Sequence, residues 1–243
     1  MDSGNIMDSD SGNRTTLSRS AVRASGGEKQ ERSLVTRQEL IDAARRIFAR
    51  DGFEVARLQD IAAAAGKTRG AFYAHFQDKE DVFFAIFEQD IARDQQTYLK
   101  ELNQSSTYEE RVAILVRNLE DIIYDKDRVL LYLEFKMYAV RHPHKRKRLA
   151  ELHLLMCTRG AAAKLALLPE LQSDDAGEQR SRTAQFGLVI DGIALNHYFD
   201  PVGLNKEQTR ERIESSVRSL MAPKSSWRKT VFYDRYAARE PEL

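Results

Sequence analysis

Apolar residues recur three or four positions apart along most of the chain, and no segment shows a sustained two-residue alternation. A spacing near 3.6 residues places apolar side chains on one face of an α-helix, whereas alternation would indicate a strand. All five prolines, which interrupt helices, lie outside these periodic runs: Pro143, Pro169, Pro201, Pro223 and Pro241. The pattern predicts an all-α fold with about nine helices.

The composition is that of a globular protein, with 42 % apolar and 31 % charged residues in 243 positions. No run approaches the roughly 18 apolar residues of a membrane span, and the polar residues 1–27 lack the apolar core of a signal peptide. We therefore expect a cytoplasmic protein with no membrane partner. The single cysteine, Cys157, excludes a disulfide framework within the chain, and we expect no metal and no cofactor. Cys157 is interpreted as a buried small apolar residue, with a thiol sensor as the alternative.

The net charge of +1 argues against a protein that binds nucleic acid by charge alone. Its distribution is uneven, since six basic and two acidic residues lie between Arg14 and Arg37. We predict a flexible basic N-terminal arm over residues 1–33. The arm is either a solvated leader or a segment that contacts the backbone or minor groove of DNA.

Capping patterns predict where the helices begin and end. Thr36 and Glu39 form a capping box that would start the first helix, and Gly52 would end it after Asp51. Thr107/Glu110 and Asn205/Gln208 form further capping boxes, which would each start a helix. The later helices are expected over residues 58–65, 69–76, 78–103, 107–124, 127–141, 144–168, 175–199 and 205–221.

The second and third helices have the features of a helix-turn-helix. Gly66 provides a tight turn, and the alanines at 62–65 allow the two helix backbones to approach closely. Phe72 and Phe76, four positions apart, would face the core. The small residues Gly70, Ala71 and Ala74 would then let the outer face enter a DNA major groove about 12 Å wide.

Several polar residues of this motif suit contacts with DNA. Arg69 can pair with a guanine edge or hold a phosphate, whereas Thr68, Tyr73, His75 and Lys79 can hydrogen-bond phosphates. Packing is the alternative role for Tyr73, and a solvated turn is the alternative for Lys67. His75 has no second ligand at helical spacing, which argues against a metal site.

The run from Thr36 to Val82, which includes the motif residues 65–76 and 78–80, resembles the DNA-binding domain of the TetR family of repressors. This resemblance implies a DNA-contact surface, to which we add two positions at the start of the second helix: Arg57, Gln59, Lys67, Thr68, Arg69, Gly70, Ala71, Tyr73, Ala74, His75 and Lys79. The chain departs from the family where Ala56-Arg57 replaces the usual Thr or Ser cap, so Arg57 would have to reach the phosphate itself. We predict a DNA-binding domain over 34–82, an effector-binding and dimerisation domain over 83–222, and a C-terminal tail over 223–243.

The resemblance also implies a homodimer, in which the last two long helices pair with their copies in a four-helix bundle. The residues expected at this seam are Gly187, Ile190, Asp191, Ile193, Ala194, His197, Ile213 and Val217. Asp191 needs a hydrogen-bond partner if it is buried, either across the dimer or within the subunit.

An effector cavity is expected between the middle helices of the larger domain. The candidates for its lining are Tyr98, Leu115, Asn118, Leu119, Glu134, Phe135, Tyr138, His153, Met156 and Phe186. A mainly apolar lining favours an unknown hydrophobic or aromatic small molecule over a sugar or a nucleotide.

Taken together, these patterns predict a transcriptional repressor that an effector releases from a palindromic double-stranded DNA operator. A DNA-binding protein of the same fold without an effector, architectural or regulated by a partner, is the alternative. An enzyme is not expected, because the chain lacks a Gly-rich phosphate loop, a Gly-x-Ser-x-Gly elbow and a His-Glu-x-x-His motif. The basic segment 141–148 is either a solvated connection or a source of long-range attraction to DNA.

Overall fold

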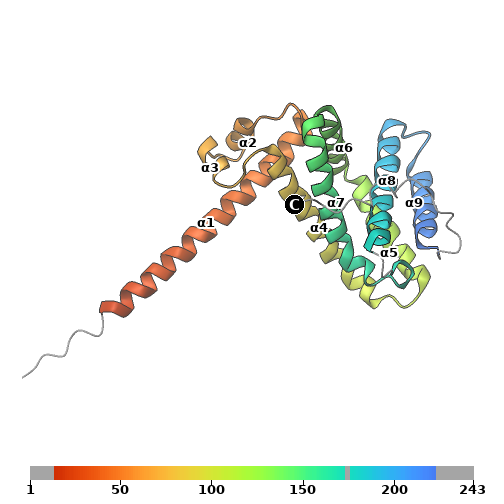
Figure 1. The fold of residues 1–243 in the computed structure, drawn as a ribbon, viewed down its shortest axis with the longest axis horizontal. Helices are drawn as coiled ribbons and strands as arrows, with labels where there is room; N and C mark the ends of the chain where they lie inside the picture. The colour runs from red at the N-terminus through yellow and green to blue at the C-terminus, as the bar shows by residue number, and fades with distance from the viewer. Residues whose placement is uncertain (1–13, 173–175, 223–243) are drawn as a thin grey trace, which may run out of the picture.

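The computed structural model describes residues 14–172 and 176–222. Within these ranges every regular element is helical, which confirms the predicted all-α class (Figure 1). The elements are α1 (Arg14–Asp51), α2 (Leu58–Ala64), α3 (Arg69–Tyr73), α4 (Lys79–Gln104), α5 (Tyr108–Tyr124), α6 (Lys126–Arg141), α7 (Pro143–Leu165), the 3-10 turn η1 (Pro169–Leu171), α8 (Ala176–Phe199) and α9 (Lys206–Met221). None of the helices in the described ranges is long and apolar enough to cross a membrane.

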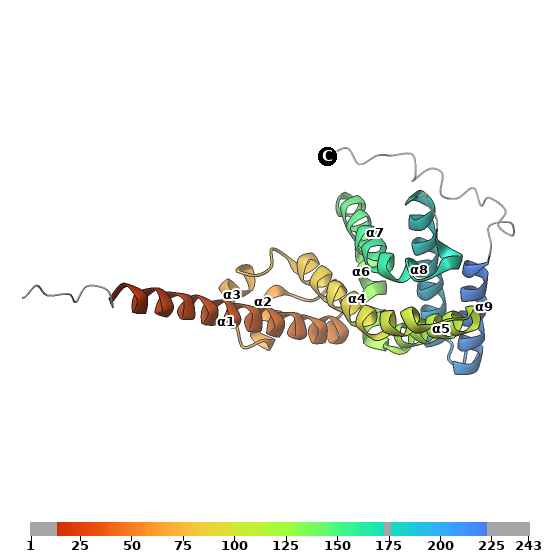
Figure 2. The same ribbon diagram turned by 90° about the horizontal axis from the view of Figure 1, so that it is seen from below.

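The first helix begins much earlier than its capping pattern predicts. Helix α1 starts at Arg14 and runs through Thr36 without interruption, so the capping box expected at Thr36 is wrong. No proline lies between Arg14 and Thr36 to stop the helix, and Glu39 pairs instead with Lys67 Nζ at 2.7 Å. The part of the predicted arm from Arg14 onward is therefore helical. It projects away from the rest of the chain in both views (Figures 1 and 2), whereas residues 1–13 lie outside the described ranges.

Two glycines set the turns that fold α1, α2 and α3 together, as predicted. Gly52 has φ +84° directly after α1, and Gly66 has φ +65° between α2 and α3. Both lie in the left-handed region that favours glycine. A Cβ atom on Gly52 would also lie 2.8 Å from Glu134 Oε2, so a side chain at this position would have to displace the Glu134 carboxylate.

An aromatic cluster joins these three helices to the rest of the protein. The Phe53 ring lies 5.8 Å from the ring of Phe83 on α4 and 5.4 Å from that of Phe135 on α6, both edge-on. Phe83 and Phe135 stack at 3.7 Å, and all three side chains are fully buried. Burying an aromatic side chain stabilises a fold by roughly 1.5–3 kcal/mol, so the N-terminal helices are held firmly against α4 and α6.

A second core lies between α5, α8 and α9, with η1 and the C-terminal end of α4 against it. The capping boxes predicted at Thr107/Glu110 and Asn205/Gln208 are confirmed at the starts of α5 and α9. Helix α4 reaches both cores, since Phe83 belongs to the first and Tyr98 to the second.

Candidate functional site

The short helix α3 is held by one buried ring and one cap. Phe72 is fully buried, and Thr68 Oγ1 accepts a hydrogen bond from the Ala71 backbone N–H at 3.1 Å. This arrangement directs the opposite side of α3 to solvent, where Arg69, Gly70, Tyr73 and Ala74 are exposed. The helix is shorter than predicted, because it ends at Tyr73 and continues only as a turn.

The exposed face of α3 has no side chain at Gly70, and the longer side chains of Arg69 and Tyr73 lie on the same face. A Cβ atom added to Gly70 would meet only Thr68 Oγ1, at 3.8 Å, so this face is open above the backbone. The Arg69 guanidinium lies 5.4 Å from the Tyr73 ring centre, and its Nη2 donates to Tyr73 Oη at 3.3 Å. Tyr73 therefore orients Arg69 along the surface of α3.

The remaining candidates of the DNA-contact surface differ in their surroundings. Arg57 and Gln59 are exposed at the start of α2, and Arg57 makes no side-chain cap there, which fits the departure from the family pattern. His75 is half-buried, with its ring 6.4 Å from that of Phe76.

The two lysines of the predicted surface are engaged within the protein. Lys67 forms the ion pair with Glu39. Lys79 Nζ donates to the carbonyl oxygens of Phe53 at 2.9 Å and Glu54 at 2.7 Å, and burial lowers the pKa of Lys79. These two hydrogen bonds use two of the three ammonium protons of Lys79, so a phosphate contact through the third stays a prediction.

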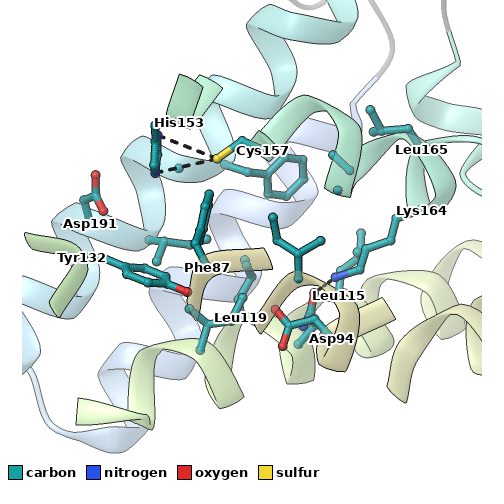
Figure 3. Close-up of a pocket in the computed structure, with 18 of the residues that line it drawn as sticks. Phe87, Asp94, Leu115, Leu119, Tyr132, His153, Cys157, Lys164, Leu165 and Asp191 are labelled. Atoms are coloured by element: carbon teal, nitrogen blue, oxygen red, sulfur yellow. Dashed lines mark hydrogen bonds between the residues drawn. The ribbon is translucent and has the colours of Figure 1, made fainter. Parts of the chain in front are cut away.

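A cavity of about 200 Å³ lies between α4, α5, α6, α7 and α8 (Figure 3). Five of the ten residues predicted for an effector cavity line it: Leu115, Asn118, Leu119, His153 and Phe186. Most of the wall is apolar, as the sequence predicts.

The other five predicted lining residues lie elsewhere and are corrections. Phe135 is in the aromatic cluster, Met156 packs against the first core, and the hydroxyl of Tyr98 donates to Asp121. Glu134 accepts a hydrogen bond from the Phe53 backbone N–H, and Tyr138 Oη donates to Glu80 at 2.5 Å. These last two polar residues of α6 therefore connect it to the N-terminal helices rather than to a ligand.

Sequence reasoning missed the charged part of the cavity wall. Arg128 is 4 % exposed, and its two terminal nitrogens donate to the Asp94 carboxylate at 3.1 and 2.8 Å. Lys136 pairs with Asp191 on the same wall, and Lys164 contributes a further ammonium group. The partners come from different helices, so no local pattern in the sequence identifies them.

His153 and Cys157 form a neutral part of the wall. The His153 ring stacks on Phe87 with centroids 5.0 Å apart, and Cys157 Sγ lies 3.8 Å from His153 Nε2. Burial lowers the pKa of His153 to about 4 and raises the pKa of Cys157 to about 11. Because the thiolate is the reactive form of cysteine, this site does not favour a thiol sensor.

Most residues predicted for a dimer seam face the interior of the protomer. Ala194, Ile213 and Val217 are at most 1 % exposed within the second core, so the expectation is wrong for these three. Three other residues predicted for the seam line the cavity instead, namely Gly187, Ile190 and Asp191. Ile193 is half-buried, and His197 Nδ1 lies 3.0 Å from both Leu204 O and Thr209 Oγ1.

The outward face of α8 carries other apolar side chains. Leu188, Leu195 and Phe199 are 60 %, 54 % and 84 % exposed, and their spacing places them on one side of the helix. This face was missed because α8 is apolar around much of its circumference, so periodicity does not distinguish the inner from the outer side.

Known proteins resemble this chain in two ways. Residues 40–86 match the family described as bacterial regulatory proteins, tetR family. The HTH-type transcriptional repressor AcnR of Corynebacterium glutamicum is 47 % identical over 58 residues, which cover 24 % of this chain and 31 % of that protein. The chain thus matches about a third of the length of this curated relative.

Two solved structures share the fold over most of the chain. A TetR-family transcriptional regulator from Mesorhizobium loti aligns with a TM-score of 0.59 at 20 % identity, over 78 % of this chain and 96 % of that one. FadR from Bacillus subtilis, solved in complex with stearoyl-CoA, aligns with a TM-score of 0.52 at 16 % identity, over 76 % and 97 %. Residues 40–86 therefore carry a helix-turn-helix of the TetR type, and the chain as a whole shares its fold with these two solved structures.

Proposed function

We propose that this protein is a transcriptional repressor that binds a palindromic DNA operator as a homodimer and is released by a small molecule. The observation that carries the proposal is the exposed face of α3, which presents Arg69 and Tyr73 beside the open backbone at Gly70. The relative named as a repressor supports the direction of regulation, since its similarity covers this same DNA-binding region.

In the proposed complex, α3 enters the major groove with Gly70, Ala71 and Ala74 against the base edges. Arg69 reads a base or holds a phosphate, and Thr68 and Tyr73 hydrogen-bond the backbone. Arg57 and Gln59 approach the phosphates from the start of α2. The phosphate contacts position the protein, whereas the base contacts select the sequence.

The outward face of α8 is the surface that we propose for the dimer. Leu188, Leu195 and Phe199 expose large apolar side chains on one helix face, and covering them would be favourable by roughly 25 cal/mol per Å² of buried apolar surface. A twofold pair would present two α3 helices for half-sites about 34 Å apart, one turn of DNA.

Helix α4 couples the proposed effector site to the DNA-binding helices. Near its start, Glu80 is buried and accepts hydrogen bonds from Tyr138 Oη at 2.5 Å and Lys145 Nζ at 2.6 Å. Further along α4, Phe87, Ile91 and Asp94 line the cavity. A ligand that binds better to another position of α4 would shift the population toward a dimer with the wrong half-site spacing.

The mainly apolar cavity wall supports a small, largely hydrophobic effector. It also favours the effector-regulated protein over an architectural one, because a purely architectural protein needs no such cavity.

We expect Arg69→Ala to weaken specific operator binding by about 1–3 kcal/mol, since a good base contact contributes that much discrimination. The affinity is measured by fluorescence anisotropy at fixed salt on an operator found by selection of genomic fragments. Arg159→Ala is the matched control, because Arg159 is exposed on α7, outside the helix-turn-helix, and should leave the affinity unchanged. Unchanged affinity and sequence preference in Arg69→Ala would remove Arg69 from the reading surface.

A further inference from the structure

Lys164 and Asn118 line the cavity side by side, and within the described ranges both have hydrogen-bond donors without an acceptor. Lys164 Nζ donates to Asn118 Oδ1 at 2.7 Å, which uses one of its three protons. Asn118 is 4 % exposed, and its Nδ2 has no hydrogen-bond partner among the described residues. A buried amide N–H₂ without a partner costs about 1–3 kcal/mol elsewhere in proteins, so its presence here calls for an acceptor.

The charges of the cavity wall leave Lys164 as the cation without an acid. Asp94 is held by both terminal nitrogens of Arg128, and Asp191 is paired with Lys136. Asp90, behind this wall, pairs with Arg45 at 2.9 Å and accepts from Tyr132 Oη at 2.6 Å. In the described part of the chain, Lys164 makes no ion pair, and the lining therefore carries one positive charge more than its acids balance.

The rest of the cavity suits an apolar body rather than further charge. Figure 3 shows the Lys164 amine near Leu115 and Asp94, whereas Phe87, His153 and Cys157 lie toward the opposite side. His153 and Cys157 are neutral at pH 7, and the volume of about 200 Å³ lies below the roughly 300–1,000 Å³ of sites for drug-sized ligands. The space fits a small aromatic ring or a short aliphatic chain.

We propose that the effector of this protein is a small amphipathic monocarboxylate, held by Lys164 Nζ and Asn118 Nδ2 at its carboxylate and by the apolar wall at its body. The proposal rests on the effector-regulated function proposed above. A single ammonium group balances one negative charge, so a phosphate dianion fits this site less well than a carboxylate.

Protonation of Lys164 makes the proposed binding depend on pH. Burial lowers the pKa of Lys164 to about 8, while the carboxylate of Asp94 raises this pKa and the guanidinium of Arg128 lowers it. Helix α4 also places the Tyr98 ring 5.8 Å from Nζ, and α5 contributes the neutral Asn118. Since only the ammonium form attracts a carboxylate, affinity should be nearly full at pH 7, about half of that at pH 8, and about tenfold weaker at pH 9 than at pH 7.

The test is isothermal titration calorimetry of the full chain without DNA, using benzoate, phenylacetate, hexanoate and octanoate against the primary amide of each. At least one acid should bind about 10- to 100-fold more tightly than its amide, because the acid makes charge-assisted hydrogen bonds. Lys164→Met should abolish this preference. Its melting temperature is measured alongside to show that the variant is folded, because the substitution also leaves Asn118 Oδ1 without its donor. Lys147→Met is the matched control, as Lys147 lies on the same helix with its side chain 87 % exposed.

Equal binding of acids and amides, absence of binding by all four acids, or full acid preference in Lys164→Met would each overturn the proposal. Operator binding by the unliganded wild type and Lys164→Met is measured separately. If neither binds DNA while the acid preference is present, the repressor function fails and the carboxylate site stands.

Discussion

Replacing Gly70 by leucine is expected to reduce operator binding to the non-specific level while leaving the fold at least as stable. The Cβ position of Gly70 is open, with Thr68 Oγ1 at 3.8 Å as its nearest contact, so the free protein accommodates the new side chain. A side chain other than glycine should also stabilise this helical position by a few tenths of a kcal/mol. In the complex, however, the leucine would occupy the space between α3 and the base edges. Specific binding exceeds non-specific binding by about 10³-fold or more, and this is the loss expected.

Anisotropy on the selected operator measures the affinity, and urea denaturation measures the free energy of unfolding. Gly70→Ala is the matched control, because a methyl group is small enough to retain most of the binding. A Gly70→Leu protein that binds the operator like the wild type would show that this face of α3 does not enter the groove.

Arg128→Met is expected to lower the free energy of unfolding by about 3–5 kcal/mol. Arg128 is 4 % exposed and holds Asp94 through two hydrogen bonds, while Asp90 Oδ2 lies 3.6 Å from its Nε. Methionine fills a similar volume but leaves the Asp94 carboxylate without its cation. Removing one partner of a buried ion pair is costly because the other charge stays buried.

Urea denaturation at pH 7 gives the free energy of unfolding for Arg128→Met and for Arg93→Met as the control. Arg93 also contacts Asp90, at 3.4 Å, but its side chain is 54 % exposed, so the control should change stability by less than about 1 kcal/mol. Adding Asp94→Leu to Arg128→Met should recover part of the loss. A loss as small as that of Arg93→Met would mean that the buried pair contributes no more than a surface contact.

Local signals in the sequence predicted the elements that depend on local chemistry. The glycine turns at 52 and 66, the capping boxes at Thr107 and Asn205, and the buried pair Phe72 and Phe76 all follow from neighbouring residues. The start of α1 was missed for the same reason. A good cap at Thr36 competes with continuation of the helix, and nothing before Thr36 interrupts it.

Features that depend on contacts between distant segments could not be predicted in this way. Asp94 and Arg128 lie on different helices, and each resembles an ordinary surface charge in its own helix. The inner and outer faces of α8 are both apolar, so the periodicity of its sequence did not predict which face is free. The exposed residues of α3 were easier to predict. Once Phe72 is assigned to the core, the spacing of a short helix determines which residues lie on the opposite, exposed side.

Selection of genomic DNA fragments by the purified full chain at near-physiological salt tests the central claim most directly. Sequencing of the bound fragments should show one enriched palindrome whose half-site centres lie about one helical turn, 10–10.5 base pairs, apart or at a multiple of that spacing. The Arg69→Ala protein should show a weaker enrichment of this palindrome. Bound fragments that share no motif, or enrichment that Arg69→Ala and Gly70→Leu both retain, would contradict a sequence-specific repressor that reads DNA through α3.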